Sequence, residues 1–265
     1  MPDLKVKIRD VTLKNPIIIA SGTPTYGPSN VKRCIRSDAA AFVTKTLCYT
    51  EWLRKQPRPR WHVEYPEAID NGAYFSLYST ERLNPTPPEE YARKKMKEYV
   101  KEAHDFDVKV IASIAGTDPE TWARLTDLVT ENGADLIELN LQCPHVEKGQ
   151  PTGMVAGRDP ELCHSILDQV RKRTSLPIIG KVVGEGVDPI RIASRMVDGG
   201  ADAVAHKRRP GDHLHVVKFR VGAARLRVSA AGQSPGNAPI FVPDGLSNRR
   251  LADCQSCDQD ESCHR

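Results

Sequence analysis

The sequence predicts an α/β fold of the TIM-barrel type, a (β/α)8 barrel, from three observations. Short apolar runs that suit buried strands alternate with longer amphipathic stretches, the order expected where crossover helices join parallel strands. No Gly-x-Gly-x-x-Gly follows any of those runs, which disfavours the doubly wound dinucleotide-binding sheet, a fold with the same alternation. The length of 265 residues is close to the roughly 250 residues typical of one barrel.

The apolar runs predict six strands, and helical spacing of apolar residues predicts the helices between them. Three helices share the start Asp-Pro, because Asp can accept hydrogen bonds from the free amides of the first turn and Pro tolerates the first helical position. These starts are Asp118-Pro119, Asp159-Pro160 and Asp188-Pro189, and a further helix is expected over 88–103. The strands are expected at 16–20, 41–44, 108–114, 136–139, 178–182 and 203–205.

A short repeat supports a chain of equivalent units. Asn132-Gly133-Ala134-Asp135 recurs as Gly199-Gly200-Ala201-Asp202, and each copy ends a helix with Gly and begins a strand. Six units of the βα type are therefore predicted.

The composition excludes several classes of protein. Apolar residues make up 39% of the chain, which excludes wholesale disorder. The apolar runs fall far short of the roughly 18 residues needed to cross a bilayer, and residues 1–7 lack the continuous apolar core of a secretory signal. Seven cysteines, an odd number, suit reduced thiols better than a disulfide framework. We therefore expect a soluble cytoplasmic protein.

Polar side chains gather where the predicted strands end, which is where a barrel places its active site. Two lysines and an asparagine at one mouth suit an electron-rich planar ligand, because ammonium and amide donors stabilise developing negative charge. A cysteine beside them could move a proton. The residues are Ser21, Lys45, Thr46, Ser113, Asn140, Cys143 and Lys181.

At these residues the sequence resembles a known family. The segment Asn140-Leu141-Gln142-Cys143-Pro144-His145, preceded by Leu136-Ile137-Glu138-Leu139, is similar to the signature of class 1 dihydroorotate dehydrogenases and of the pyrimidine-binding domain of dihydropyrimidine dehydrogenases. The resemblance covers residues 1–205. It also includes Asn15-Pro16 through Ala20-Ser21-Gly22, Lys45-Thr46 with Pro57, Pro59 and Arg60 downstream, Ser113-Ile114-Ala115-Gly116, and Lys181.

The resemblance implies an FMN-dependent oxidoreductase that acts on the C5–C6 bond of a dihydropyrimidine in pyrimidine metabolism. Cys143 would be the catalytic acid/base at C5, while hydride passes between C6 and the flavin. Lys45 and Lys181 would hold the flavin and favour its anionic reduced form. The implied cofactor-binding residues are Ala20, Ser21, Lys45, Thr46, Ser113, Asn140 and Lys181, and the implied substrate-binding residues are Lys45, Asn140 and His145.

Departures from the family pattern leave the substrate open. His145 stands where dihydroorotate enzymes usually have an Asn, as in the dihydropyrimidine dehydrogenases, and Gln142 replaces a common Ser. The family's substrate-binding Asn after the second strand has no sure counterpart, although Asn71 and Ser76 lie near the place. The alternatives are a reductase of uracil or thymine and, from another class, an inactive barrel fragment that acts as a binding subunit. A partner subunit for electron transfer and a homo-oligomer also stay open.

Residues 206–265 differ from the rest of the chain, and we expect the barrel to be incomplete after the sixth strand. They contain ten Lys and Arg against six Asp and Glu, so the net charge of +4 lies there and residues 1–205 are neutral. The family's next two strands, whose Gly-Gly turns hold the FMN phosphate, are not recognisable in this segment. We accordingly expect two unpaired sheet edges, weak or no FMN binding and a tendency to aggregate.

Three interpretations of this segment compete. The first is a segment unrelated to the family, through a frameshift or a mispredicted gene end, or disordered. The second, a basic tail for nucleic acid, is disfavoured because its only aromatic residues are Phe219 and Phe241. The third is a metal site built from Cys254, Cys257, Cys263 and His264. It is disfavoured because zinc sites usually have a longer loop than the five residues between Cys257 and Cys263, so no metal is expected.

Overall fold

The computed structural model describes residues 3–55, 61–64, 76–79, 82–143, 153–182, 187–207 and 215–219. All of them belong to the first of two compact units, Met1–Arg227. The second unit, Val228–Arg265, lies outside the described residues.

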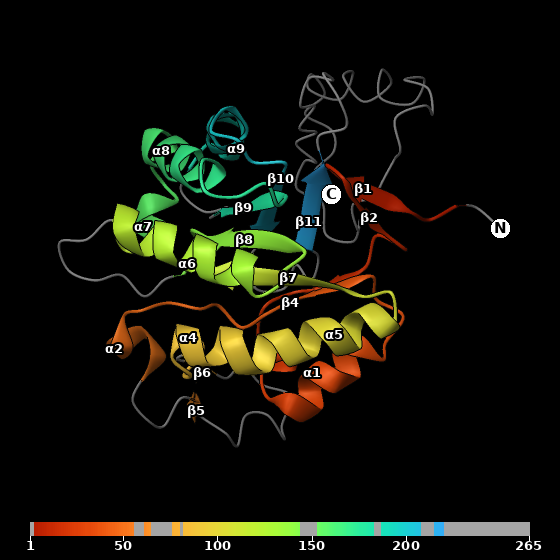
Figure 1. Ribbon diagram of the computed structural model, residues 1–265. Coiled ribbons are helices and arrows are strands. Elements are labelled where there is room, and N and C mark those ends of the chain that lie inside the picture. The colour runs from red at the N-terminus through yellow and green to blue at the C-terminus, as the bar shows by residue number, and fades with distance from the viewer. Residues whose placement is uncertain are drawn as a thin grey trace, which may run out of the picture. The chain divides into compact units, whose positions relative to one another are not determined.

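A seven-stranded sheet forms the centre of the first unit. Its order is β11-β10-β9-β8-β7-β4-β3, and six of these strands are parallel and follow chain order. They curl into a half-barrel with helices on the outer face, which confirms the predicted fold class as a partial barrel (Figure 1). The parallel strands are β3 (Ile18–Ile19), β4 (Ala41–Val43), β7 (Lys109–Ile114), β8 (Leu136–Asn140), β9 (Ile178–Val182) and β10 (Ala203–Lys207).

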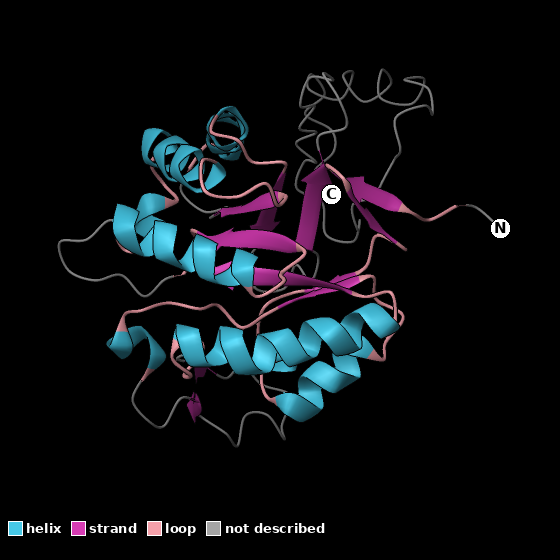
Figure 2. Cartoon of the chain, in the orientation of Figure 1, coloured by secondary structure: helices cyan, strands magenta, loops and turns pink. Residues whose placement is uncertain are grey.

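The helices lie on one side of the strands (Figure 2), and three of them begin as the Asp-Pro pairs predict. Asp118, Asp159 and Asp188 each accept hydrogen bonds from backbone N–H groups of the first turn of α6, α8 and α9. The helix expected over 88–103 is confirmed, with a π-helical segment inside it. The helices are α1 (Pro28–Ile35), α2 (Glu51–Arg54), α4 (Pro88–Glu90), η2 (Tyr91–Met96), α5 (Lys97–Asp105), α6 (Pro119–Glu131), α7 (Gly153–Ala156), α8 (Pro160–Arg171) and α9 (Pro189–Asp198), with a 3₁₀ turn η1 (Thr23–Thr25).

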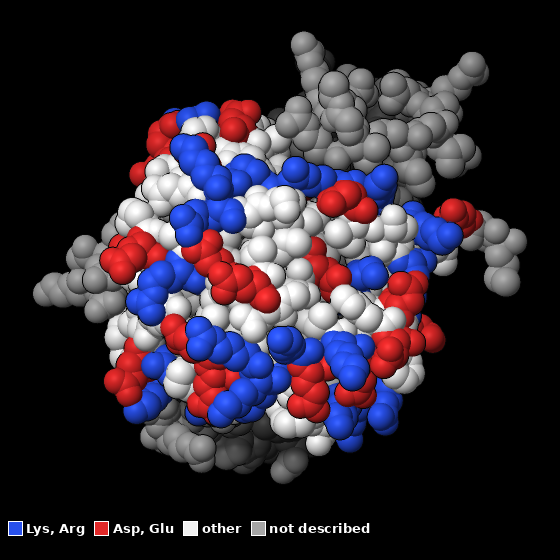
Figure 3. Space-filling model, in the orientation of Figure 1, with Lys and Arg blue, Asp and Glu red and all other residues white. Residues whose placement is uncertain are grey.

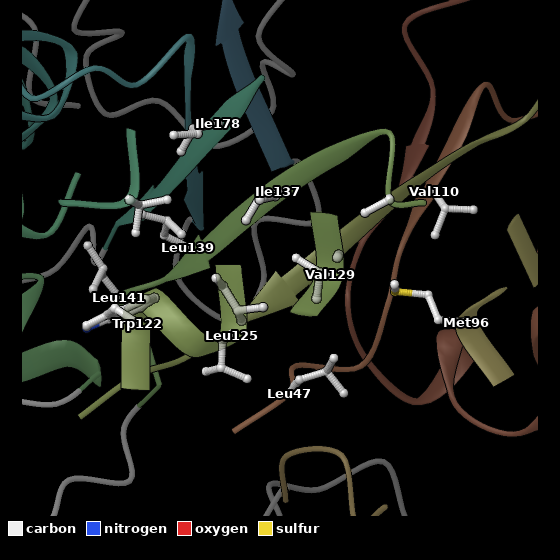
Figure 4. Packing of buried hydrophobic residues seen from close by; sticks show 14 of the residues in the cluster. Leu47, Met96, Val110, Trp122, Leu125, Val129, Ile137, Leu139, Leu141 and Ile178 are labelled. Atoms are coloured by element: carbon white, nitrogen blue, oxygen red, sulfur yellow. The ribbon is translucent and has the colours of Figure 1, made fainter. Parts of the chain in front are cut away.

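The outer face of the sheet packs against the helices. Side chains alternate between the two faces of a strand, so every second residue of each strand points toward the helices. In Figure 4, Trp122, Leu125 and Val129 of α6 lie over Ile137 and Leu139 of β8. This layer is larger than the apolar core on the inner face.

The inner face has a smaller apolar core at the amino-terminal ends of the strands. The hairpin of β1 (Val6–Ile8) and β2 (Val11–Leu13) closes this end, with Ile8 and Leu13 fully buried. Its partners from the parallel strands are Ala41, Val43, Ile111, Leu136, Ile179, Ala203 and Ala205. The carboxyl ends of the same face are left for polar residues.

The open sheet ends at β11 and β3, so the edge expected at β10 is moved outward by one strand. Strand β11 (His215–Phe219) pairs with β10 antiparallel, from Ala203↔Phe219 to Lys207↔His215. The adjacent Val216 and Val217 suit a strand, and five residues are enough once a neighbouring edge is available. A separate two-stranded sheet pairs β5 (Trp61–Glu64) with β6 (Ser76–Ser79).

The surface over helices α5 and α6 carries charges of both signs. Figure 3 shows Lys and Arg interspersed with Asp and Glu on this face, which is typical of a solvated surface. Within the described ranges, no helix has the length and apolar content to span a membrane.

Candidate functional site

The candidate site occupies the carboxyl end of the inner face. Following each strand by steps of two residues from the small inner core leads to a polar side chain: Val43 to Lys45, Ile111 to Ser113, Ile179 to Lys181. On β8 the same steps lead from Leu136 to Glu138 and Asn140. Lys45, Ser113, Glu138, Asn140 and Lys181 are all buried, each at most 9% exposed.

Five of the buried side chains, from the segment after β4 and from β7, β8 and β9, form one continuous chain of hydrogen bonds. Asn140 Nδ2 donates to Thr46 Oγ1 over 3.0 Å, and Thr46 Oγ1 lies 2.9 Å from Ser113 Oγ. Ser113 Oγ donates to Glu138 Oε1 over 3.0 Å, and Lys181 Nζ donates to the same oxygen over 3.3 Å. The structure therefore brings together four of the predicted site residues, and Glu138 joins two of them.

Glu138 and Lys181 form a buried ion pair. Their side chains are 5% and 10% exposed, so little water reaches either charge. An ionised group out of water is costly unless it is paired, and this pair leaves the two charges balanced. Glu138 lies within the sequence motif, but the family resemblance assigns it no role. The signal that could have pointed to it is a carboxylate at an inward-facing position of a buried strand.

The backbone around Lys45 and Thr46 is held by Asn84, a second residue that the sequence did not indicate. Asn84 is fully buried, its N–H donates to the Thr46 carbonyl over 2.8 Å, and its amide donates to the Lys45 carbonyl over 3.5 Å. The N–H of Ser113 donates to Thr44 Oγ1 over 3.1 Å, which ties β7 to the same segment. These contacts fix the strand end that carries two predicted site residues.

Cys143 lies buried beside this chain in a small apolar cluster that also includes Cys48, Leu53, Leu83 and Ala115. Its carbonyl accepts the N–H of Met154 over 2.9 Å. Burial raises the pKa of Cys48 to about 12 and the nearby Cys143 adds to the rise, so Cys48 stays protonated at neutral pH. The two thiols thus lie in the same apolar cluster. Cys48 is a poor proton acceptor because it stays protonated.

Gly153 is required beside Cys143. Its φ of +50° lies in the left-handed region, and a Cβ at this position would clash with the carbonyl oxygen of Cys143. The glycine lets α7 approach the segment that carries the thiol.

The other predicted site residues are less closely joined. Ala20 and Ser21 follow β3 half-buried, outside the hydrogen-bond chain that the described residues form. His145, Asn71, Pro57, Pro59 and Arg60 lie outside the described residues, as do the tail residues Cys254, Cys257, Cys263 and His264; of Ser76 only the backbone is described. Within the described ranges, no three metal-binding side chains come together.

Comparison with known proteins is consistent with this architecture. A family model described as dihydroorotate dehydrogenase matches residues 3–206. A protein of Caldicellulosiruptor bescii, described as dihydroorotate dehydrogenase B (NAD(+)), catalytic subunit, is 32% identical over 203 residues, which cover 77% of this chain and 62% of that protein. A Methanocaldococcus jannaschii protein of the same description is 30% identical over 201 residues, covering 76% and 61%. The chain therefore spans less than two thirds of these relatives.

A third relative aligns over more of the chain. The Methanothermobacter thermautotrophicus protein of that description is 32% identical over 244 residues, covering 90% of this chain and 73% of the relative. Because 90% of this chain is more than its first 206 residues, the alignment includes residues beyond the match to the family model.

Proposed function

The chain belongs to the dihydroorotate dehydrogenase family, and on that premise we propose that it is an FMN-dependent oxidoreductase acting on the C5–C6 bond of a dihydropyrimidine, with dihydroorotate as the first candidate. The buried polar chain from Asn140 to Lys181 carries the proposal, because it collects donors and charge at the mouth of the half-barrel. The family model matches residues 3–206. The activity, the cofactor and the substrate of this chain are our proposal.

The residues present fit the ring end of FMN. The ring offers carbonyl oxygens and ring nitrogens, and the site offers the Asn140 amide and the ammonium groups of Lys45 and Lys181. These side chains would hold the ring and stabilise negative charge on it. When bound, FMN supplies the acceptor for the hydride that leaves C6 of the substrate.

Cys143 would take the proton from C5. Loss of that proton leaves the C5–H electron pair to form the C5=C6 double bond, while the hydride departs from C6. The apolar cluster around Cys143 limits access of water to the thiol. Cys143 is the candidate for the base because it belongs to the motif that follows β8, three residues after Asn140, whereas Cys48 does not.

A second candidate substrate is dihydrouracil or dihydrothymine. It is favoured by His145 and Gln142, which depart from the usual dihydroorotate pattern. Both candidates need the same proton and hydride transfers, so the carboxylate of dihydroorotate is the difference that an assay has to test.

We also propose that the chain works with a partner subunit. The relatives are described as catalytic subunits of an NAD(+)-dependent enzyme, which implies a second subunit in their assemblies. A partner of this chain would remove electrons from FMN after each turnover.

Anaerobic reduction of the flavin tests the proposal. The purified chain is loaded with FMN and mixed with dihydroorotate or dihydrouracil, and loss of the oxidised-flavin absorbance is followed. Cys143→Ser should slow reduction by about 10²–10⁴-fold, the usual value of a general base. Cys48→Ser is the matched control and should reduce at close to the parental rate. If neither substrate reduces the flavin of the parent chain, the proposed function is wrong.

A further inference from the structure

We propose that Glu138 is a positioning residue of the flavin site, which holds Lys181 directly and sets the direction of the hydrogen bond between Ser113 and Thr46, the residue that Asn140 contacts. The inference rests on the proposed function, since it concerns how the side chains proposed to bind the flavin ring are positioned. It assigns a role to a buried carboxylate for which the motif resemblance provides none.

The first part concerns Lys181. Its ammonium is buried on β9 and lies 3.3 Å from Glu138 Oε1 on the neighbouring β8. A lysine side chain has four rotatable carbons and little geometric preference of its own. The carboxylate therefore decides where the charge is placed, and it compensates that charge.

The second part concerns the direction of the hydrogen bonds. An ionised carboxylate can only accept hydrogen bonds, so the Ser113 hydroxyl donates its single hydrogen to Glu138. Ser113 Oγ must then accept from Thr46, and Thr46 Oγ1 in turn accepts from the amide of Asn140. One negative charge at the end of the chain thus determines the direction of the hydrogen bond between Ser113 and Thr46.

Asn140, at the other end of the chain, is held from both sides. Its Nδ2 donates to Thr46 over 3.0 Å, and its Oδ1 accepts the N–H of Gln142 over 3.2 Å. An amide with both ends assigned cannot turn over. Only one of the two Nδ2 hydrogens is used by Thr46, so the other can be presented to a ligand in a defined direction.

A neutral residue at position 138 would neither fix the direction of these hydrogen bonds nor compensate the charge of Lys181. A glutamine at position 138 could present its NH₂ group to Ser113, which would reverse the hydrogen bond between Ser113 and Thr46. It would also leave the Lys181 charge without a counter-ion in a buried place. An aspartate keeps the charge and the acceptor, although it is one methylene shorter.

Thermal unfolding of the chain without flavin tests the ion pair. Glu138→Gln should lower Tm by on the order of 10 °C, because it leaves one buried charge unpaired. The double variant Glu138→Gln/Lys181→Met should recover more than half of that loss. Glu131→Gln, the same change at an exposed position of α6, is the control and should leave Tm unchanged. Lys181→Met is measured alone as well, and if its loss and that of Glu138→Gln simply add in the double variant, the role of Glu138 is contradicted.

Titration with FMN and with riboflavin, followed by flavin fluorescence, tests the positioning. Glu138→Gln should weaken binding of either flavin about tenfold or more, and Glu138→Asp should restore much of it. A Glu138→Gln variant that folds and binds flavin as tightly as the parent overturns the inference. If the parent itself binds neither flavin, the proposed function fails, and the unfolding cycle still decides whether Glu138 and Lys181 are coupled.

Discussion

Tyr49 donates a hydrogen bond of 2.8 Å from its hydroxyl to Glu89 Oε1. The guanidinium of Arg124 lies 4.2 Å from the centre of the Tyr49 ring and donates to the same Glu89 oxygen over 3.3 Å. Tyr49 belongs to the segment that follows β4, Glu89 to α4 and Arg124 to α6. The three side chains therefore fasten the segment carrying Lys45 and Thr46 to two helices of the outer layer.

Removing the Tyr49 hydroxyl should weaken this fastening. Tyr49→Phe is expected to lower the free energy of unfolding by about 1 kcal/mol, because the hydrogen bond is lost while the ring stays over Arg124. Urea denaturation measures the change. Tyr26→Phe is the matched control: its hydroxyl accepts only a 3.5 Å bond from Arg82, and its effect should stay within about 0.5 kcal/mol. Equal effects at both positions would contradict the role of Tyr49.

Alkaline pH should destabilise the fold. Burial, with the hydrogen bond to Glu89, raises the pKa of Tyr49 to about 12, and burial raises the pKa of Cys48 and of Cys163 to about 12. The unfolded chain loses these protons first, near the ordinary values of 10.0 for Tyr and 9.0 for Cys, and then binds fewer protons than the folded chain. The stabilisation is therefore complete below about pH 9 and is lost as the pH rises toward 12.

The measurement is Tm at intervals from about pH 8 to about pH 11. Cys48→Ala should flatten the decline because it removes one of the linked groups. A Tm that stays constant over this range would show that the three groups titrate alike in both states.

Substitution of Gly153 should disturb Cys143. Gly153→Ala places a Cβ against the Cys143 carbonyl and adds left-handed strain, at an expected cost of about 1–3 kcal/mol. Gly27→Ala is a useful control, because its φ of +87° carries the same kind of strain but nothing lies within 4 Å of the added Cβ. Only Gly153→Ala should slow the reduction of bound flavin. Similar rates in the two variants would mean that this glycine does not set the position of the thiol.

Riboflavin and FMN should bind with similar affinity, within about threefold. The proposed site holds the flavin ring through buried side chains, and the sequence predicts no phosphate-binding turns after residue 206. Fluorescence titration of both flavins measures the ratio. An FMN affinity about a hundredfold higher than that of riboflavin would reveal a phosphate site elsewhere in the chain.

The features that the sequence predicts well are local ones. The start of α6 at Pro119 follows from the capping chemistry of Asp118, and the six parallel strands follow from runs of apolar residues. The repeated Gly-Ala-Asp also has a repeated role: Asp135 Oδ2 accepts the N–H of Val110, and Asp202 Oδ2 that of Ile178, each on the preceding strand. A short segment contains enough information for such features.

The features that the sequence does not predict depend on distant partners. Glu138 looks like any polar residue in a strand until its inward position and the nearby Lys181 are known. Strand β11 has only five residues, and it becomes a strand by pairing with the exposed edge of β10. Asn84 acts on Lys45 and Thr46 across nearly forty positions of the chain, which no local pattern reveals.

The antiparallel direction of β11 has a consequence for barrel closure. It occupies the outer backbone groups of β10 along five residue pairs, from Ala203↔Phe219 to Lys207↔His215. A seventh barrel strand would run parallel and would need those same N–H and C=O groups. The two arrangements are mutually exclusive, so a strand that pairs parallel with β10, from this chain or from another, must first displace His215–Phe219. Until then the half-barrel shields its own β10 edge from association with other strands.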